Sequence, residues 1–318
     1  MAELNLTKVV TKHGDRTTII SYEEGDFRTF WDSRCKSLLH KRECEIVKKL
    51  LPPSEGWFID LGCGFGRLAP AYLDAKKHIV AVDYSVKHLE IAQETYPEDN
   101  VFFIAADACH LPFRDGVFQS GICIRLLHHI ASPGALLCEL SRIFADEAFL
   151  VFNYMNKRNL MRILKYGRDS FEHDHKQIHD VLFATHPKFL KRLTRNCGFR
   201  TISQEGTGFT HQITHRCALM ERIIDEVPSL IHLLAVAEKI YGLTLGNLRL
   251  ALMQYSLLKK VSDDEVSWQS PMPRNIVDIL LCPRCHSVEM CEDEDEIKCT
   301  NCGKSYPKNA HIYDFRLS

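Results

Sequence analysis

Two pairs of cysteines near the end of the sequence have the spacing of a metal site. Cys282 and Cys285 form one C-x2-C pair, Cys299 and Cys302 form a second, and 13 residues separate the pairs. Two such pairs can bring four thiolates together as a tetrahedron around zinc. Four cysteine ligands leave no open coordination position, so we expect a structural Zn²⁺ whose binding folds a segment too small to fold by itself.

A glycine-rich turn at residues 60–66, DLGCGFG, is the second candidate site. Glycine allows a tight turn and lets a ligand approach the backbone. The pattern G-x-G-x-G behind an acid differs from the G-x-G-x-x-G of dinucleotide sites. Asp83 ends the next predicted strand, where a carboxylate can accept hydrogen bonds from ribose hydroxyls. Taken alone, the turn also fits an ordinary tight turn of an α/β protein.

The segments around this turn alternate between strand and helix patterns. Strands are predicted at residues 57–60, 78–82, 101–105, 118–124 and 149–154. Helices are predicted at residues 26–51 (one or two helices), 66–73, 85–96 and 133–144. This alternation predicts an α/β fold with a parallel, doubly wound sheet.

Helical patterns dominate after residue 156. Helices are predicted at residues 160–166, 186–197 and 216–243, the last interrupted at Pro228, and strands at residues 199–205 and 248–255. Residues 262–274, which carry three acids, two prolines and three serines, are predicted to be a linker. The tail from residue 275 onward is predicted to be a separate unit.

Four motifs within residues 57–154, in chain order, resemble one known family. DLGCGFG, VAVDYS, AADACHLPFRDGVF and LLHHI look like the class I S-adenosylmethionine-dependent methyltransferases, specifically the branch with ubiquinone-biosynthesis and tRNA wobble-uridine methyltransferases. The resemblance implies a seven-stranded Rossmann-like sheet and S-adenosyl-L-methionine as cofactor. The cofactor-binding residues that it implies are Asp60, Gly62, Cys63, Gly64, Gly66, Asp83, Tyr84, Asp107, Ala108, Ile124 and Arg125. Arg125 is unusual, because the family mostly has small or apolar residues there.

Candidate catalytic residues follow the fourth and fifth predicted strands. A sulfonium methyl group is already activated, so the enzyme mainly aligns the nucleophile and excludes water. A general base is needed only for a nucleophile that carries a proton at neutral pH. His128, His129 and Tyr154 lie where open α/β sheets bind ligands. The alternative is structural: the histidines pack under the sheet or cap a helix, and Tyr154 is a pocket wall.

The cysteine-containing tail resembles a zinc-ribbon family related to the small activator subunit of tRNA, rRNA and release-factor methyltransferases. ILLCPRC, IKCTNCGKSYP and IYDF carry this resemblance. Cys291 breaks the spacing and is predicted to be free. The acidic run CEDEDE would repel phosphates, which argues against the ribbon tip as a nucleic-acid reader. The predicted organisation is a methyltransferase domain at 1–261 with substrate-covering insertions at 156–200 and 207–245, a linker at 262–274 and a zinc ribbon at 275–318.

The middle of the chain has an asymmetric charge. Residues 155–200 hold eleven Lys and Arg against four Asp and Glu, a local charge of +7. This region could recognise an anionic substrate, or it could be a solvated basic helix face. His175 and His179 could share a helix face with metal-ligand spacing, as could His211 and His215, but no carboxylate or cysteine pattern completes either set.

The whole chain has 318 residues and a formal net charge of -1, so any attraction to nucleic acid must come from a local patch. No secretory signal and no membrane-spanning segment is recognised, and we expect a cytoplasmic protein without a membrane partner. The leading prediction is methyl transfer to an oxygen or nitrogen of a small metabolite, which could be anionic. RNA, tRNA above all, is the alternative substrate. A second alternative is a non-catalytic adaptor that binds a protein partner through the ribbon.

Overall fold

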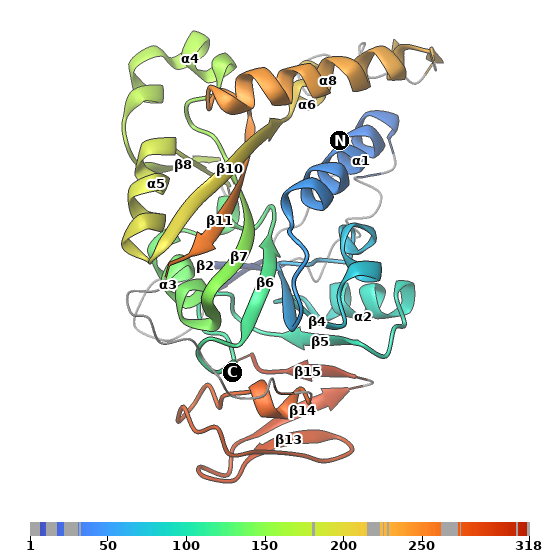
Figure 1. Cartoon of the computed structure of the whole chain (residues 1–318), viewed down its shortest axis with the longest axis vertical. Helices are drawn as coiled ribbons and strands as arrows, with labels where there is room; N and C mark the ends of the chain where they lie inside the picture. Colours follow the sequence, from blue (N-terminus) through green and yellow to red (C-terminus); the bar gives the residue numbers. More distant parts are fainter. Residues whose placement is uncertain are drawn as a thin grey trace.

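One mixed sheet organises the fold (Figure 1). The computed structural model describes residues 7–10, 18–21, 31, 33–179, 182–214, 223–224, 226–227, 229–261, 273, 275–309 and 311–316. The sheet contains β3 (Trp57–Leu61), β4 (His78–Asp83), β5 (Val101–Ala105), β6 (Phe118–Cys123), β7 (Phe144–Met155), β10 (Phe199–Thr207), β11 (Met253–Lys260), β12 (Met290–Glu292), β13 (Glu296–Cys299), β14 (Ser305–Asn309) and β15 (Ile312–Asp314). Their spatial order is β10-β11-β7-β6-β3-β4-β5-β15-β14-β13-β12.

The first seven strands in that order form the predicted seven-stranded sheet. β3, β4, β5, β6 and β7 pair in parallel, whereas β11 is antiparallel to both β7 and β10. The parallel strands are largely buried and therefore rich in apolar residues: all five residues of Trp57–Leu61 are buried, and four of them are apolar. The predicted α/β class and doubly wound sheet are confirmed.

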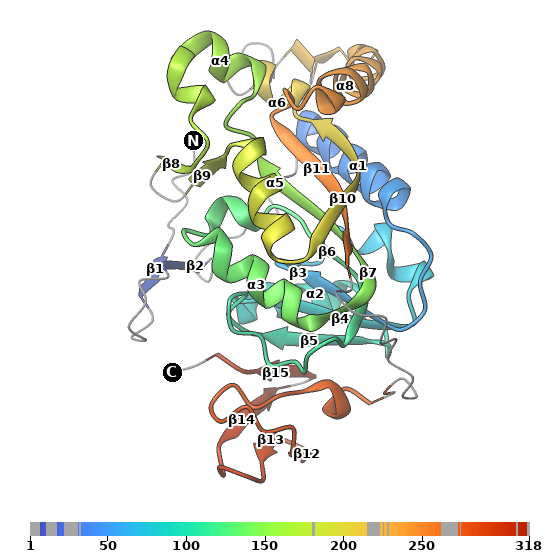
Figure 2. The ribbon, with the colours of Figure 1, turned by 60° about the vertical axis from the view of Figure 1, so that its left-hand side comes forward.

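Helices cover both faces of the sheet (Figure 2). The α-helices are α1 (Arg34–Leu50), α2 (Val86–Thr95), α3 (Pro133–Ile143), α4 (Leu160–Tyr166), α5 (Pro187–Asn196), α6 (Phe209–Thr214) and α8 (Leu230–Asn247). Alternate side chains of a strand point to opposite faces. On β7, Val151 joins the core under α1, whereas Phe152 joins the core that includes residues of α3 and α5. The sheet is therefore the middle layer between two cores.

The connections after β7 lie beyond the carboxyl ends of the parallel strands. α4 follows β7, and α6 follows β10, which runs in the same direction as β7. α8 leads into the start of β11, whose first residue, Met253, pairs with the last residue of β7. A hairpin of β8 (His175–His179) and β9 (Leu182–Thr185) also lies there, and β1 (Thr7–Val10) pairs with β2 (Thr18–Ser21) as a separate hairpin.

The C-terminal ribbon continues the sheet. β15 pairs in parallel with β5, and Leu281 N–H donates to the carbonyl of Pro112 (2.9 Å). Ribbon residues such as Tyr306 and Phe315 belong to the same buried cluster as Phe113. β15 thus covers the backbone edge that β5 would otherwise expose. The tail was predicted as a separate unit, but residues 275–316 share a core with the main fold.

Two secondary-structure predictions are wrong. Residues 66–73 contain 3-10 turns, η2 (Ala69–Ala71) and η3 (Leu73–Ala75), because Gly66 has φ +78° and Pro70 lacks the N–H of a helix interior. The last strand starts at Met253 instead of residue 248. Residues 175–179 form a strand, so His175 and His179 do not share a helix face. The other three short 3-10 turns are η4 (Leu127–His129), η5 (Gly167–Phe171) and η6 (Val277–Ile279).

Some predictions fall on residues outside the described ranges. The linker at 262–274 is described only at Pro273, whose carbonyl accepts a hydrogen bond from Trp57 Nε1 (2.8 Å). The first part of the predicted helix 216–243 and His215 also lie outside, as does the side chain of His179. None of the described helices is long and apolar enough to span a membrane.

Candidate functional site

The glycine turn lies between the carboxyl ends of β3 and β4. The φ values are positive at three glycines: +78° at Gly62, +55° at Gly64 and +78° at Gly66. Residues with a side chain rarely adopt this backbone conformation. A Cβ added to Gly64 would meet no atom within 4 Å, whereas one at Gly62 would lie 3.1 Å from Leu126. The backbone at Gly64 is therefore open to a ligand.

Asp83 fixes the shape of this turn. Its carboxylate accepts hydrogen bonds from Gly64 N–H (2.9 Å) and Ser85 N–H (3.0 Å). Ser85 in turn caps α2, its side chain accepting from His88 N–H (3.3 Å). The carboxylate thus joins the glycine turn to the end of β4, at the position where the sequence predicts the ribose contact. The aromatic ring of Tyr84, also a predicted cofactor residue, lies beside it and faces Arg316.

Asp107 is held in a tight turn after β5. It accepts a hydrogen bond from Cys109 N–H (2.9 Å), and His110 Nδ1 lies 3.0 Å from its second oxygen. Ala108 is half-buried at the same turn, and the thiol of Cys63 is buried on the glycine turn. The predicted cofactor residues of β3, β4 and β5 thus lie along one edge of the sheet, at neighbouring carboxyl ends.

Asp60 plays a structural part behind the glycine turn. Its carboxylate is buried and accepts a hydrogen bond from the Tyr72 hydroxyl (2.7 Å). Burial raises the pKa of Asp60 to about 7, and the charge of Asp83 adds to this effect. The Asp60 carboxyl group is therefore partly protonated near neutral pH.

Arg125 follows β6 and is held by Asn153 and Glu43. Its backbone has φ +59°, and its N–H donates to Asn153 Oδ1 (2.6 Å). Its guanidinium contacts the Glu43 carboxylate of α1 through Nε (2.9 Å) and a terminal nitrogen (2.8 Å). Ile124, the adjoining predicted cofactor residue, is buried in the core under α1.

Glu43 holds a second guanidinium as well. Arg67, just after the glycine turn, lies 2.7 Å from Glu43 Oε2, and the Tyr255 hydroxyl donates to Glu43 Oε1. Burial alone would raise the pKa of Glu43, but Arg125 and Arg67 outweigh it and lower the pKa to about 2. Glu43 is therefore ionised at neutral pH and ties α1 to the glycine turn and to the end of β6.

The ring of Trp31 closes this cluster from the N-terminal side. The Arg67 guanidinium lies 3.9 Å and that of Arg125 5.1 Å from the ring centroid. His40 Nδ1 lies 3.1 Å from Arg67, and burial, followed by the charge of Arg67, lowers the pKa of His40. Trp31 and α1 thus cover the edge of the sheet next to Arg125.

His128 and His129 lie together on η4, with ring centroids 4.2 Å apart. His128 is buried, and its Nδ1 has no hydrogen-bond partner among the described residues. Burial lowers the pKa of His128 well below its usual value, with smaller effects from His129 and Arg125. Its imidazole is therefore neutral. The Nδ2 of Asn153 is a second buried donor without a partner among the described residues.

Tyr154 points to the opposite face of β7 from Asn153. It packs in the core with Phe152 and Leu190, and burial raises its pKa. The phenol is therefore protonated at neutral pH. Among the predicted catalytic residues, only the two histidines are adjacent, and Tyr154 has the environment of a wall residue.

The geometry fits S-adenosylmethionine. The open backbone at Gly64 offers close approach, and Asp83 is an acceptor at the end of β4. The buried Asn153 Nδ2 is a donor without a partner in the part of the chain that the structure describes. These features lie at the carboxyl edge of a parallel sheet, where α/β proteins bind ligands. The site residues predicted from the sequence are thus compatible with this cofactor.

The four spaced cysteines converge in the ribbon. The sulfur atoms of Cys282, Cys285, Cys299 and Cys302 lie within 4.8 Å of one another. Two of the separations are 3.8 Å (Cys282–Cys302) and 3.6 Å (Cys285–Cys299). Zn–S bonds of about 2.3 Å in a tetrahedron place sulfur atoms about 3.8 Å apart. The cluster therefore fits a structural zinc ion. Cys291 is exposed and outside the cluster.

The predicted histidine metal pairs find no support in the described residues. His175 binds Thr185 Oγ1 (2.8 Å) and the Ile130 carbonyl (2.7 Å), which holds the β8–β9 hairpin on η4. Among the described residues, the four cysteines form the only cluster of three or more side chains that could hold a metal ion. His175 therefore has a structural role.

The basic middle region divides into two parts. Asp169, Glu172 and Asp174 pair with cations of the same segment: Lys157 contacts Asp174 (2.5 Å), and Arg162 and Lys176 contact Asp169. The remaining basic side chains include an exposed row on α5, Lys188, Lys191, Arg192 and Arg195. α5 packs flat on β10 and α3, so this row faces away from the sheet.

Comparison with known proteins finds similarity to methyltransferases. Residues 59–152, which include the glycine turn, Asp83, Asp107 and Arg125, match the family described as "Methyltransferase domain". The solved structures agree on the fold: a putative S-adenosylmethionine-dependent methyltransferase from Listeria monocytogenes aligns with TM-score 0.52 and 14% identity, over 71% of this chain and all of that one.

Other relatives are more varied. A sterol 4-C-methyltransferase of Caenorhabditis elegans is 25% identical over 53% of this chain and 51% of its own length. A demethylmenaquinone methyltransferase of Paenarthrobacter aurescens is 33% identical over 27% of this chain and 33% of its own. A solved complex of the Haloferax volcanii Trm112 methyltransferase activator with a putative methyltransferase aligns with TM-score 0.51 and 16% identity, over 76% of this chain and 98% of that one. The chain spans about half, or less, of these curated relatives.

Sequence reasoning missed the residues that brace Arg125. Glu43, Arg67 and Tyr255 come from three distant segments, and no motif links them. The one available signal is Arg125 itself, a charged residue where the family mostly has none. A buried guanidinium needs a carboxylate partner, so an acid in a neighbouring helix could have been sought.

Proposed function

We propose that the protein transfers a methyl group from S-adenosylmethionine, in line, to a nucleophilic oxygen or nitrogen of a small metabolite. The observation that carries this proposal is the open glycine turn at Gly64, whose amide is held by Asp83, within a matched methyltransferase domain. Residues 156–186 and 207–245, beyond the carboxyl edge, are proposed to cover the substrate. α5 packs on the sheet instead, so we no longer include it in the cover.

The residues around the site would position the reactants. When bound, S-adenosylmethionine supplies a methyl group activated by its sulfonium. Gly64 and Asp83 would hold the cofactor, and Arg125 with Trp31 would exclude water beside Ile124. His128 is proposed as the base for a nucleophile that carries a proton, because its imidazole is neutral and its Nδ1 has no hydrogen-bond partner among the described residues. Tyr154 is proposed as a wall residue.

An anionic substrate group is compatible with the charges at the site. Two guanidinium groups, Arg67 and Arg125, share the one carboxylate of Glu43. The cluster therefore carries one excess positive charge at the edge where the substrate would bind. The sterol and menaquinone relatives suggest that an uncharged lipid-like acceptor should be screened as well.

Asp83→Ala should weaken S-adenosylmethionine binding by about 1.5–3 kcal/mol, or roughly 10- to 150-fold, because a charged hydrogen-bond partner is lost. Isothermal titration calorimetry measures this. Asp99→Ala, which removes an exposed carboxylate in the turn before β5, is the matched control and should bind normally. Equal affinity of both variants would remove Asp83 from the site.

Labelled cofactor offered to small-molecule, RNA and protein extracts then identifies the acceptor; binding without transfer to any of them would favour the adaptor alternative.

RNA remains the alternative substrate because of the exposed basic row on α5. For a small substrate, the triple variant Lys188→Ala, Lys191→Ala, Arg192→Ala should leave kcat/KM unchanged, since these side chains face away from the sheet. For RNA, the variant should weaken binding, and the wild-type log affinity should fall with log salt by about 0.7 per phosphate contact on a single strand. Filter binding of total tRNA over a salt series separates the two substrates.

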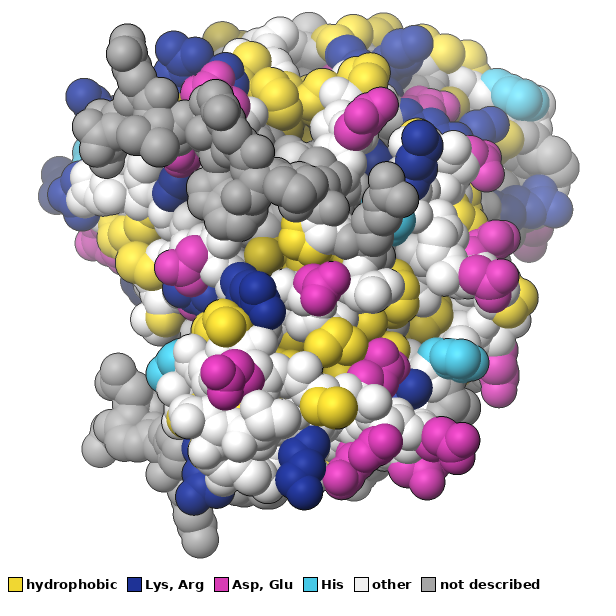
Figure 3. Space-filling view, turned by 60° about the horizontal axis from the view of Figure 1, so that its bottom comes forward, with side chains coloured by type: hydrophobic (Ala, Val, Ile, Leu, Met, Phe, Trp, Pro, Cys, Tyr) yellow, Lys and Arg dark blue, Asp and Glu magenta, His cyan; other side chains and the backbone are white. Residues whose placement is uncertain are grey.

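We propose that the ribbon binds structural zinc and supports the cofactor site within the same chain. β15 covers β5, and the Arg316 guanidinium stacks 5.6 Å from the ring centroid of Tyr84, next to Asp83. This arrangement agrees with the resemblance of the tail to an activator subunit. Acidic side chains gather at one side of the ribbon end of the molecule (Figure 3), which favours a protein partner over RNA for any further contact there.

A further inference from the structure

Helix α8 buries its acid and exposes a row of apolar side chains, the reverse of an ordinary surface helix. Its acid, Glu238, is fully buried. Leu233, Val236, Ile240 and Leu243 are 68%, 58%, 57% and 43% exposed. Spacings of three, four and three residues place these four side chains in one stripe along the helix. Such a stripe on a fixed helix indicates a docking surface.

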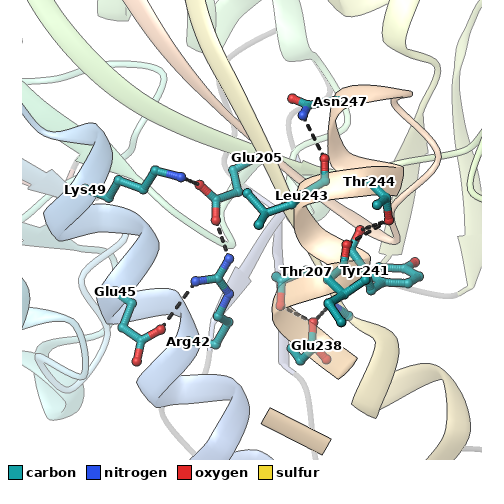
Figure 4. A network of polar contacts seen from close by, with 12 residues as sticks. Arg42, Glu45, Lys49, Glu205, Thr207, Glu238, Tyr241, Leu243, Thr244 and Asn247 are labelled. Atoms are coloured by element: carbon teal, nitrogen blue, oxygen red, sulfur yellow. Dashed lines mark hydrogen bonds and ion pairs between the residues drawn. The ribbon is translucent and has the colours of Figure 1, made fainter. Parts of the chain in front are cut away.

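Buried contacts fix the orientation of α8 (Figure 4). Glu238 accepts hydrogen bonds from Thr207 Oγ1 (2.6 Å), Gly208 N–H (2.6 Å) and Thr210 N–H (2.7 Å). Rotation of the helix about its axis would break all three bonds and leave a carboxylate buried without partners, which is costly.

Two glycines fix the same orientation independently. A Cβ added to Gly242 would lie 2.2 Å from the Gly206 carbonyl oxygen, and one at Gly246 would lie 2.4 Å from Gly206 N. Only glycine therefore allows this face of α8 to lie on β10. The face with glycines and Glu238 must point inward, so the apolar stripe must point outward.

Helix α4 presents similar chemistry at the same end of the molecule. Figures 1 and 2 both draw α4 and α8 at the end opposite the ribbon, and Leu160 N–H donates to the Leu250 carbonyl (3.0 Å), just after α8. Leu164 is 73% exposed, and Tyr166 is exposed as well. We define the α4–α8 surface as Leu160, Leu164 and Tyr166 of α4 with Leu233, Val236, Ile240 and Leu243 of α8.

The exposed charges on α4 and α8 themselves are basic. Lys165 and Lys239 are exposed on these helices, and Arg168 is exposed just after α4. Among the described residues of α4 and α8, no carboxylate is exposed, since Glu238 is buried; the exposed Glu172 and Glu226 lie outside the two helices. A second copy that used the same surface would bring the basic side chains of these helices together. A surface of phosphate headgroups over acyl chains would complement both the cations and the apolar side chains.

We propose that the α4–α8 surface docks on the surface of a bilayer that contains anionic lipids. Peripheral docking needs no spanning helix, so it agrees with the absence of one among the described residues. The contact would place the carboxyl edge of the sheet, with its candidate site, near the bilayer. The proposal does not depend on methyl transfer, and its test uses no substrate.

Flotation with vesicles tests the proposal. The full-length protein should float with phosphatidylcholine–phosphatidylglycerol vesicles (3:1) and much less with phosphatidylcholine alone. Leu233→Ser with Ile240→Ser should reduce the bound fraction at least tenfold, because apolar side chains are lost from the contact. Ile202→Ser with Val288→Ser, 46% and 45% exposed at other places, is the matched control and should bind like wild type.

The cations are tested separately. Lys165→Gln, Arg168→Gln and Lys239→Gln together should weaken binding to anionic vesicles about 100-fold, at about 1 kcal/mol per charge near such a surface. Lys191→Gln with Arg195→Gln on α5 should have little effect.

Absence of vesicle binding by the wild type, or equal binding by the serine variant, overturns the proposal. A wild-type dimer in sedimentation velocity that dissociates in the serine variant would assign the surface to a second copy instead.

Discussion

Cys282→Ser should release the zinc and destabilise the whole domain. The wild type is expected to hold one equivalent of zinc, because four sulfur atoms lie within 4.8 Å of one another. A structural zinc site contributes about 10 kcal/mol or more of binding free energy to the fold that it closes. Cys282 is buried in the same core as Phe113, so the loss should spread beyond the ribbon. Elemental analysis and thermal unfolding measure the two effects.

Cofactor affinity should fall together with the zinc. β15 pairs with β5 up to Ala105, and the Phe315 N–H donates to the Ala105 carbonyl (2.8 Å). If the ribbon unfolds, β5 regains an open edge and Tyr84 loses the Arg316 guanidinium. Calorimetry with S-adenosylmethionine should therefore show weaker binding by Cys282→Ser.

Cys291→Ser is the matched control for the zinc prediction. Cys291 lies in the same ribbon but is exposed and outside the cluster. This variant should keep one equivalent of zinc, the wild-type melting temperature and the wild-type cofactor affinity. A wild-type protein purified without chelator that contains no zinc would contradict the prediction, and so would a Cys282→Ser variant that melts like Cys291→Ser.

Local patterns predicted the sheet and the two clusters of motif residues well. The parallel strands are rich in apolar residues and lie between turn residues, and the cysteine spacing is typical of a tetrahedral metal site. Asp83 could be placed because the end of a parallel strand determines the edge at which its side chain lies. Whether His128, His129 and Tyr154 act in catalysis stays a prediction.

Features that depend on distant pairing could not be predicted. Glu43 meets Arg125 across 82 residues, and neither side chain shows its partner in the local sequence. From the sequence, the apolar stripe of α8 would be assigned to the core. Its outward orientation depends on Gly206, in another element, and on the buried Glu238, and local sequence does not show these contacts. The docking of the ribbon on β5 was missed for a similar reason: an open strand edge is a property of the sheet and leaves no motif.

The position of α1 shows how the fold prepares the candidate site. Glu43 of α1 bridges Arg67, just after β3 and its glycine turn, and Arg125, just after β6. In the sheet β3 and β6 are neighbours, so one carboxylate can reach the loops that follow both. A second group of contacts, between Glu205 of β10 and both Arg42 and Lys49 of α1, fixes the same helix farther along (Figure 4). Helix α1 is therefore held by ion pairs at two places along its length.

Glu43→Gln should destabilise the protein by about 3–5 kcal/mol at neutral pH, because two partly buried guanidinium groups lose the buried carboxylate that they share. It should also change the response to acid. The pKa of Glu43 is lowered to about 2, so its ionised form stabilises the fold above pH 4.5, and this contribution, about 3 kcal/mol, is lost as the pH falls from about 4.5 to 2. Urea unfolding at pH 7, 5 and 3 should show this loss in the wild type and a smaller one in Glu43→Gln. Glu45→Gln, half-exposed on the same helix, is the matched control and should follow the wild type at every pH. If Glu43→Gln keeps the full acid dependence, the Glu43 carboxylate does not hold α1 over the site.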